Sequence, residues 1–308
     1  MIKSNLTIKN YLQKNHLNSR VNKKLSSSYK NVISQIIDKT VIPNQFFYLF
    51  NEKFRLNFKV NDLKKFKKYK TVVLVGMGGS ILGSEAIYSL FRAKIKKNFY
   101  FLNDLNIDKI KSLKKKISVN KTLFLIISKS GNTTETVSNF FYLDILKKNS
   151  KNIIIITEKT DNILFNISKR FNLFFIEHKN YIGGRYSVLS EVGMLPAELM
   201  GLNTKNFKQL NSIIKNKNFL NSLIMNVGAT LNFVRNKKYN SIIINYDEKS
   251  QNLFYWYQQL IAESLGKNSK GLLPIISLMP KDNHSVMQLY LDGFKNNFFT
   301  IFYVKEKN

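Results

Sequence analysis

The sequence contains no cysteine and only three histidines, His16, His178 and His284, among 308 residues. Without cysteine there is no disulfide framework, no thiol nucleophile and no thiolate metal site, and three scattered histidines argue against a zinc cluster. Any catalysis must therefore depend on carboxylates, lysine, arginine or a single histidine.

Long hydrophobic runs are also missing. No apolar stretch approaches the roughly 20 residues that a membrane-spanning helix needs, and the first residues lack the apolar core of a signal peptide. A hydrophobic content of 44% over 308 residues is nevertheless ample for one large core or two modest domains. We therefore expect a folded cytoplasmic protein with no membrane partner.

Acidic residues are scarce: 19 Asp and Glu stand against 49 Lys and Arg, a net charge of +30. Such a balance raises the question of nucleic-acid binding. The lysines are scattered among an excess of Asn and Ile, however, which is typical of compositional bias, and no recognition helix or aromatic–basic RNA motif is found. We expect no nucleic-acid partner, although the charge would steer an anionic metabolite toward the protein.

The distribution of apolar runs predicts three regions. Residues 1–69 are polar and basic with loose helical periodicity, which indicates an N-terminal helical segment. Regions 70–205 and 206–308 each contain short apolar runs that alternate with helical patterns, and this alternation predicts parallel α/β layers in two domains. The runs are 72–75, 99–102, 123–127, 153–156 and 173–176 in the first domain, and 242–244, 275–278 and 298–304 in the second.

A run of small hydroxyl residues, Ser128 to Thr136, follows the third apolar run directly. Asn132 with Glu135 three residues later forms a capping-box pattern, so we expect a helix to start among these hydroxyls. The free N–H groups and the positive dipole end of such a helix would offer a phosphate several donors. The alternative is an ordinary Ser/Thr-rich turn with a good cap.

The first apolar run of the domain leads into a glycine-rich turn that contains Ser80. The spacing excludes a dinucleotide fingerprint, because its third glycine would fall at Ile81, and no Gly-Lys-Ser/Thr follows to make a phosphate loop. Neighbouring parallel strands end at the same edge of a sheet. We therefore expect the Ser80 turn and the Ser128–Thr136 turn to converge on one phosphate.

Two further segments carry charged candidates. Arg185 follows two glycines and suits an oxyanion or a bound water, or alternatively it pairs with a neighbour such as Glu191. Gln259 and Glu263 share one helix face. A carboxylate partly buried beside Tyr255 and Trp256 would make a general base; the alternative is a surface carboxylate that balances Lys267.

His284 is the remaining candidate. Asp282 or Asn283 can cap a helix that ends at Gly293, which would place His284 at the positive helix end and favour a neutral imidazole able to exchange protons. A lone histidine is also often structural.

Together these motifs resemble the glucose-6-phosphate isomerase family. The matching segments stand in order over roughly residues 70–300: Gly-x-Gly-Gly-Ser80-x-Leu-Gly, Ser128-Lys-Ser-Gly-x-Thr-Thr-Glu-Thr136, Gly-Gly-Arg185-Tyr-Ser-Val-Leu-Ser, Gln-Gln-Leu-x-x-Glu263-Ser-x-Gly-Lys267 and Asn-His284-Ser-x-x-Gln-Leu. The resemblance implies an α/β fold of two sugar-isomerase (SIS) domains, each a parallel sheet flanked by helices in three αβα layers.

The resemblance also implies roles. Glu263 would move a proton between C2 and C1 of glucose 6-phosphate and fructose 6-phosphate through a cis-enediolate that Arg185 stabilises. His284 would help to open the sugar ring in the neighbouring subunit of a homodimer. The implied site needs neither a metal nor an organic cofactor, and the residues implied to bind the sugar phosphate are Gly79, Ser80, Ser128, Lys129, Ser130, Thr133 and Gln259.

Family members usually continue past the His284 helix into a region with an active-site lysine, whereas this sequence stops at Asn308. The second domain is therefore expected to be incomplete, and either truncation or altered activity fits the ending. Two alternatives stay open: a sugar-phosphate sensor without catalysis, and a bifunctional phosphoglucose/phosphomannose isomerase.

Overall fold

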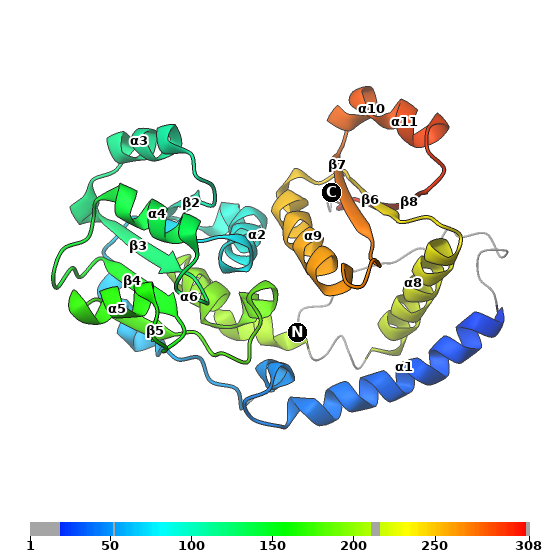
Figure 1. Cartoon of the computed structure of the whole chain (residues 1–308), viewed down its shortest axis with the longest axis horizontal. Helices are drawn as coiled ribbons and strands as arrows, with labels where there is room; N and C mark the ends of the chain where they lie inside the picture. The colour runs from blue at the N-terminus through cyan, green and yellow to red at the C-terminus, as the bar shows by residue number, and fades with distance from the viewer. Residues whose placement is uncertain (1–18, 52, 211–215, 306–308) are drawn as a thin grey trace.

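The structure, a computed structural model, describes residues 19–51, 53–210 and 216–305. Two lobes each contain a parallel sheet, and helix α1 (Ser19–Thr40) runs beneath the second lobe toward the first (Figure 1). Helix α1 contacts the first lobe through the turn η2 (Phe46–Phe50) and the second through α8 (Lys217–Arg235). Residues 1–18 of the predicted N-terminal segment, which include His16, lie outside the described residues.

The first sheet has five strands in the order β2-β1-β3-β4-β5, and every neighbouring pair is parallel. All five strands predicted from apolar runs are confirmed. The strands are β1 (Thr71–Val75), β2 (Asn98–Leu102), β3 (Thr122–Ile127), β4 (Ile153–Thr157) and β5 (Phe174–Glu177).

Helices cover both faces of this sheet, which explains why its central strands are apolar at nearly every position. Val72 and Leu74 pack with helices on one face, and Val73 and Val75 pack with helices on the other. Full burial of each such side chain contributes roughly 1.5–3 kcal/mol. The first face carries α2 (Leu82–Phe91) and α6 (Glu191–Leu199); the second carries α3 (Ile107–Lys116), α4 (Thr134–Leu143) and α5 (Ile163–Arg170).

The second sheet has the order β7-β6-β8 and is also parallel. The three predicted strands are confirmed, although the third ends at Phe302. The helix expected to run from Asp282 or Asn283 to Gly293 is instead two short helices. A longer helix, α9 (Gln251–Leu265), packs on α2 and so joins the two lobes. The other elements are β6 (Asn240–Asn245), β7 (Leu273–Leu278), β8 (Asn297–Phe302), α10 (Lys281–Ser285) and α11 (Met287–Asp292).

Short 3₁₀ turns connect these elements, and two of them carry candidate residues. The two that carry candidate residues are η4 (Gly78–Ser80) and η7 (Gly184–Leu189). The others are η3 (Val60–Phe66), η5 (Arg92–Lys94), η6 (Val119–Lys121), η8 (Thr204–Leu210) and η9 (Glu248–Ser250). The α/β architecture of parallel sheets flanked by helices is thus confirmed.

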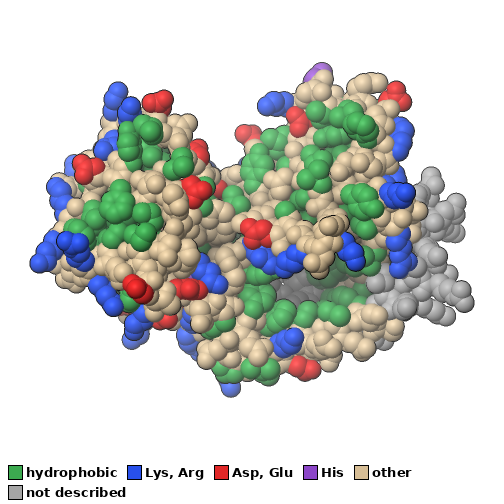
Figure 2. All heavy atoms as spheres, in the orientation of Figure 1, with side chains coloured by type: hydrophobic (Ala, Val, Ile, Leu, Met, Phe, Trp, Pro, Cys, Tyr) green, Lys and Arg blue, Asp and Glu red, His purple; other side chains and the backbone are tan. Residues whose placement is uncertain are grey.

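Basic side chains are spread over both lobes on the face drawn in Figure 2. This distribution matches the scattered lysines of the sequence. Among the described helices, none is both long and apolar enough to span a membrane.

His178 is buried just past the carboxyl end of β5, with 1% of its surface exposed. Its Nδ1 lies 3.0 Å from the carbonyl oxygen of Lys179, so Nδ1 carries the proton and donates. Nε2 is buried and has no hydrogen-bond partner among the described residues. Burial, opposed by the hydrogen bond to the Lys179 carbonyl and reinforced by the nearby charge of Lys129, lowers the pKa of His178 to about 4.

This depressed pKa predicts acid sensitivity. Between pH 6.5 and about 4 the unfolded chain takes up a proton at His178 that the folded chain does not, so stability should fall as the pH falls through this window. The loss attributable to this residue is up to about 3 kcal/mol. Urea unfolding at a series of pH values should show a flatter profile for His178→Gln than for the wild type.

The control is His284→Gln, which changes an exposed histidine and leaves His178 in place, so the wild-type profile should persist. Buried Glu191 has the opposite effect on the pH dependence of stability. Burial raises the pKa of its carboxyl group, so its contribution to the free energy of unfolding falls as the pH rises. Because both variants retain Glu191, it cancels in the comparison. Identical pH profiles for wild type and His178→Gln would contradict the prediction.

Candidate active site

Three hydroxyl groups form a cluster where β3 gives way to α4, and we call Ser128, Ser130 and Thr133 the hydroxyl cradle. The Ser128 and Thr133 hydroxyls are 2.8 Å apart, and the Ser130 hydroxyl lies 3.5 Å from each. The backbone N–H groups of Gly131 and Asn132 donate to Ser128 and Ser130 at 3.1 and 3.3 Å. Each hydroxyl rotates freely enough to turn its proton toward an anion.

The start of α4 differs from the predicted capping box. Thr133 occupies the N-cap position, without a side-chain capping bond. Asn132 instead accepts a hydrogen bond from the backbone N–H of Ile163 at 2.9 Å. The capping-box prediction is wrong because this side chain is used to hold the next loop. Gly131 is required there, since its φ is +68° and a Cβ would lie 1.8 Å from Asn162 Oδ1.

The glycine-rich turn after β1 lies beside the cradle. Strands β1 and β3 are direct parallel neighbours, so both turns leave the same edge of the sheet. A Cβ on Gly76 would lie 3.0 Å from the carbonyl oxygen of Ile127 and 3.1 Å from the Cβ of Ser80. The Ser80 turn therefore lies beside the end of β3, and the convergence of the two turns on one phosphate stays a prediction.

The backbone before Arg185 packs against the same turn. A Cβ on Gly79 would lie 2.2 Å from the carbonyl oxygen of Gly184, so no other residue fits without moving this backbone. The Ser187 hydroxyl lies within hydrogen-bond distance of two carbonyl oxygens, those of Gly79 at 3.1 Å and Gly184 at 2.7 Å. On the opposite side, the Trp256 indole donates to the carbonyl of Arg185 at 3.0 Å.

Helix α9 brings the predicted base to Arg185. Glu263 Oε2 lies 3.3 Å from the Arg185 guanidinium, and Glu263 Oε1 accepts a 2.7 Å hydrogen bond from Gln259. Arg185 therefore pairs with Glu263. The alternative pairing of Arg185 with Glu191 does not form, and Glu263 does not pair with Lys267. The Glu263 side chain is 49% exposed, more open than the partly buried carboxylate that was predicted.

Gln259 also reaches the glycine-rich turn. Gly78 has a φ of +51°, and a Cβ there would lie 2.7 Å from Gln259 Nε2. The turn, the Arg185 segment and α9 thus meet at one place, with the hydroxyl cradle at the adjoining strand end. Such a site presents a carboxylate, a guanidinium, an amide and several hydroxyls, a set suited to moving a proton on an anionic polar substrate.

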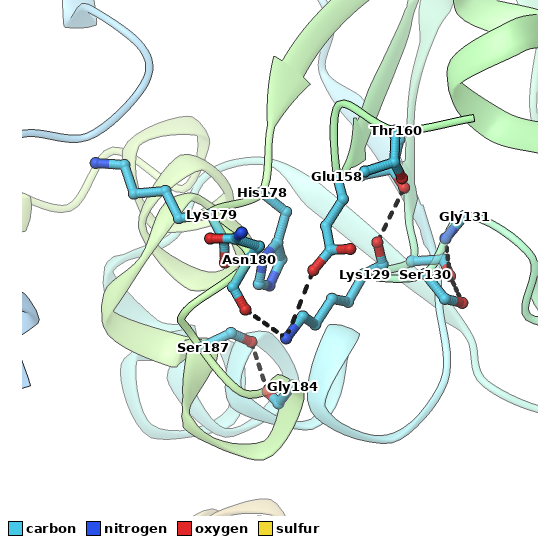
Figure 3. A network of polar contacts seen from close by, with 12 residues as sticks. Lys129, Ser130, Gly131, Glu158, Thr160, His178, Lys179, Asn180, Gly184 and Ser187 are labelled. Carbon is cyan, nitrogen blue, oxygen red and sulfur yellow. Dashed lines mark hydrogen bonds and ion pairs between the residues drawn. The ribbon is translucent and has the colours of Figure 1, made fainter. Parts of the chain in front are cut away.

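Lys129 does not extend along the cradle. Its side chain runs away from Ser130 toward the end of β5 (Figure 3). There the ammonium donates to the carbonyl of Asn180 at 2.9 Å and lies 3.6 Å from Glu158 Oε1.

His284 lies apart from the other candidates. It is exposed on α10, which packs against β7 and α11. The helix begins at Lys281, so His284 occupies its last turn and not the positive end, and that expectation is wrong. The expected cap does not form because Asp282 lies inside the helix and accepts from the backbone N–H of Leu278 at 2.7 Å.

Sequence reasoning missed one group at the centre of the site. The Ser264 hydroxyl accepts from Arg185 Nε at 3.0 Å and lies 2.7 Å from the hydroxyl of Tyr186. Ser264 could have been identified from the sequence, because it directly follows Glu263 in the segment Gln-Gln-Leu-x-x-Glu263-Ser-x-Gly-Lys267. Glu158 and Asn180, which both bind the Lys129 ammonium, could not be recognised from the sequence. They follow strands at positions that belong to none of the motifs.

Comparison with known families gives a match over most of the chain. The family model described as phosphoglucose isomerase matches residues 5–272. The glucose-6-phosphate isomerase of Methanocaldococcus jannaschii is 34% identical over 80% of this chain and 63% of its own length. That of Mycoplasma capricolum is 30% identical over 100% of this chain and 76% of its own length.

Solved structures share the fold. A hypothetical protein from Thermus thermophilus superposes with a TM-score of 0.74 at 22% identity, covering 92% of this chain and 72% of that one. A glucose-6-phosphate isomerase from Chlamydia trachomatis gives 0.63 at 19% identity, covering 79% and 52%.

This chain spans less than two thirds of some relatives, 63% of the Methanocaldococcus jannaschii protein and 62% of the Campylobacter jejuni protein. The family match nevertheless extends through the cradle, Arg185 and Glu263. The chain therefore belongs to the phosphoglucose isomerase family.

Proposed function

We propose that this chain is an aldose–ketose isomerase that interconverts glucose 6-phosphate and fructose 6-phosphate. The observation that carries the proposal is the 3.3 Å approach of Arg185 to Glu263 beside the hydroxyl cradle. The first domain (70–205) supplies the cradle and Arg185, and the second (206–308) supplies Glu263. Relatives named glucose-6-phosphate isomerase support the choice of substrate.

Glu263 acts as the base. Its carboxylate takes the proton from C2 of the open-chain aldose and returns it to C1 through a cis-enediolate, while the proton of the O2 hydroxyl passes to O1. The amide of Gln259, 2.7 Å from Glu263 Oε1, orients the carboxylate. The Glu263 side chain is 49% exposed, so the bound sugar excludes water from the reacting atoms.

Arg185 stabilises the enediolate, since a guanidinium stays charged at any working pH. The phosphate binds where Gly79, Ser80 and the hydroxyl cradle meet, and the net charge of +30 draws the anion in. This chemistry needs no metal or organic cofactor. His284 opens the sugar ring in the site of a second subunit, which accounts for its exposure away from Glu263.

The alternatives are less well supported. A non-catalytic sensor has no need of Glu263, and the Arg185–Glu263 pair therefore favours an enzyme. A bifunctional phosphoglucose/phosphomannose isomerase would use the same base, and no described contact favours it.

The cradle is tested by removing two hydroxyls. Ser128→Ala with Thr133→Ala should weaken binding of 6-phosphogluconate roughly 100-fold or more, because two hydrogen bonds to a charged group are lost. Isothermal calorimetry measures the affinity, with Ser150→Ala as a control that removes a hydroxyl bonded to Lys147. Unchanged affinity in the double variant would remove the phosphate from the cradle.

The base is tested by an isosteric change. Glu263→Gln should still bind fructose 6-phosphate, whereas exchange of the C2 proton with solvent should slow by about 10²- to 10⁴-fold. Deuterium incorporation followed by NMR gives the rate. Exposed Glu248→Gln, at the turn before α9, should exchange at the wild-type rate. Equal exchange by wild type and Glu263→Gln would refute the mechanism.

Shared sites are tested by mixing inactive subunits. A dimer of one Glu263→Gln chain and one His284→Ala chain contains one intact site if the histidine crosses over. Refolding the two variants together should restore about a quarter of the wild-type activity, since half of the dimers are mixed. No recovery in a mixture shown to be dimeric by ultracentrifugation would place His284 in its own subunit's site.

A further inference from the structure

The ammonium of Lys129 is already bound by other groups of the protein, the carbonyl of Asn180 and the carboxylate of Glu158. The side chain is 32% exposed, and its ion-pair partner Glu158 is 21% exposed. Its hydrogen bond to the carbonyl of Asn180 is 2.9 Å long. The backbone carbonyl of Lys129 is held as well, accepting from Thr157 Oγ1 and from the backbone N–H of Glu158, each at 3.1 Å.

The carbonyl that Lys129 binds belongs to the segment that carries Arg185. Asn180 precedes Arg185 by five residues, and turns in between are closed by backbone bonds from Ile182 to Lys179 and from Tyr186 to Gly183. This short, hydrogen-bonded segment links Asn180 to Arg185. Figure 3 shows the Lys129 side chain bridging from the cradle strand to this segment.

Lys129 also connects directly to the cradle, because it lies between Ser128 and Ser130 in the chain. Any shift of the cradle backbone on anion binding moves the base of this side chain. A lysine placed in this way has one end at the cradle and the other end on the Arg185 segment.

We propose that the Lys129 side chain is a positioning residue that couples occupancy of the cradle to the placement of Arg185. This proposal rests on the proposed function, because it assumes that the hydroxyl cradle binds the phosphate. The side chain itself does not bind the phosphate. It holds the Arg185 segment against the ends of β3 and β4, so that the guanidinium meets the substrate only when the cradle is set.

The molecule contains its own reporter of this coupling. Trp256 is the single tryptophan, and its indole donates to the carbonyl of Arg185 at 3.0 Å. Its fluorescence therefore responds to movement of the Arg185 segment, without any need for turnover.

The test compares wild type with Lys129→Met, which keeps the length of the side chain and removes its charge. In wild type, inorganic phosphate should shift the Trp256 emission as the cradle fills. In Lys129→Met the free protein should show altered emission and stronger acrylamide quenching, and the phosphate response should disappear. The calorimetric affinity for phosphate should change by less than about twofold, because the cradle hydroxyls remain.

Kinetics separate positioning from binding. With fructose 6-phosphate, Lys129→Met should lower kcat about tenfold or more with little change in KM, since a small misplacement of a catalytic group slows the chemical step. Lys129→Arg should restore most of the loss. Glu158→Gln, which leaves the bond to Asn180 intact, should show a smaller effect in the same direction.

The outcomes are distinguishable. Loss of phosphate affinity in Lys129→Met, with Trp256 unchanged, would make Lys129 a phosphate ligand and overturn the proposal while preserving the proposed function. Absence of phosphate binding in wild type would refute the cradle instead. Wild-type fluorescence and kcat in Lys129→Met would also overturn the coupling.

Discussion

The candidate site depends on the contact between two backbone turns. Gly79 and Gly184 approach so closely that a Cβ on Gly79 would lie 2.2 Å from a carbonyl oxygen. Since β1 ends at the same edge of the sheet as β3, this contact also places Arg185 near the hydroxyl cradle. Helix α9 then completes the arrangement, because it packs on α2 and contacts both turns. The catalytic candidates therefore come together through packing, and not through their own attraction.

The two lobes contribute differently to this arrangement. The first sheet has both faces covered and its central strands are buried at almost every position. The three-stranded second sheet leaves side chains of β8 such as Phe299 and Ile301 exposed by 43% and 62%. The proposed base, Glu263, thus comes from the more exposed lobe, and its position relative to the cradle is fixed mainly by contacts of α9 with the better-packed lobe, including the bond from Trp256 to Arg185.

Much of this was predictable from sequence. Buried parallel strands leave unbroken apolar runs, so the eight strands of the described residues were foreseen, as was the common sheet edge at which the Ser80 turn and the Ser128–Thr136 turn lie. Side-chain partners were not, because they depend on which loops meet in space. Asn132 fits a capping box by spacing, yet Ile163 claims its oxygen. Lys129 stands within a phosphate-binding motif, yet the carbonyl of Asn180, 51 residues away, holds its ammonium.

The pairing of Arg185 with Glu263 has a consequence for the proposed chemistry. At rest the guanidinium faces the carboxylate at 3.3 Å, and the two charges balance. When Glu263 takes the C2 proton it becomes neutral, while a negative charge develops on the enediolate oxygen. Arg185 then exchanges one anionic partner for another nearby, and little charge has to be moved through solvent. Because preorganised charges require little reorganisation during the reaction, the position of Arg185 bears directly on the rate.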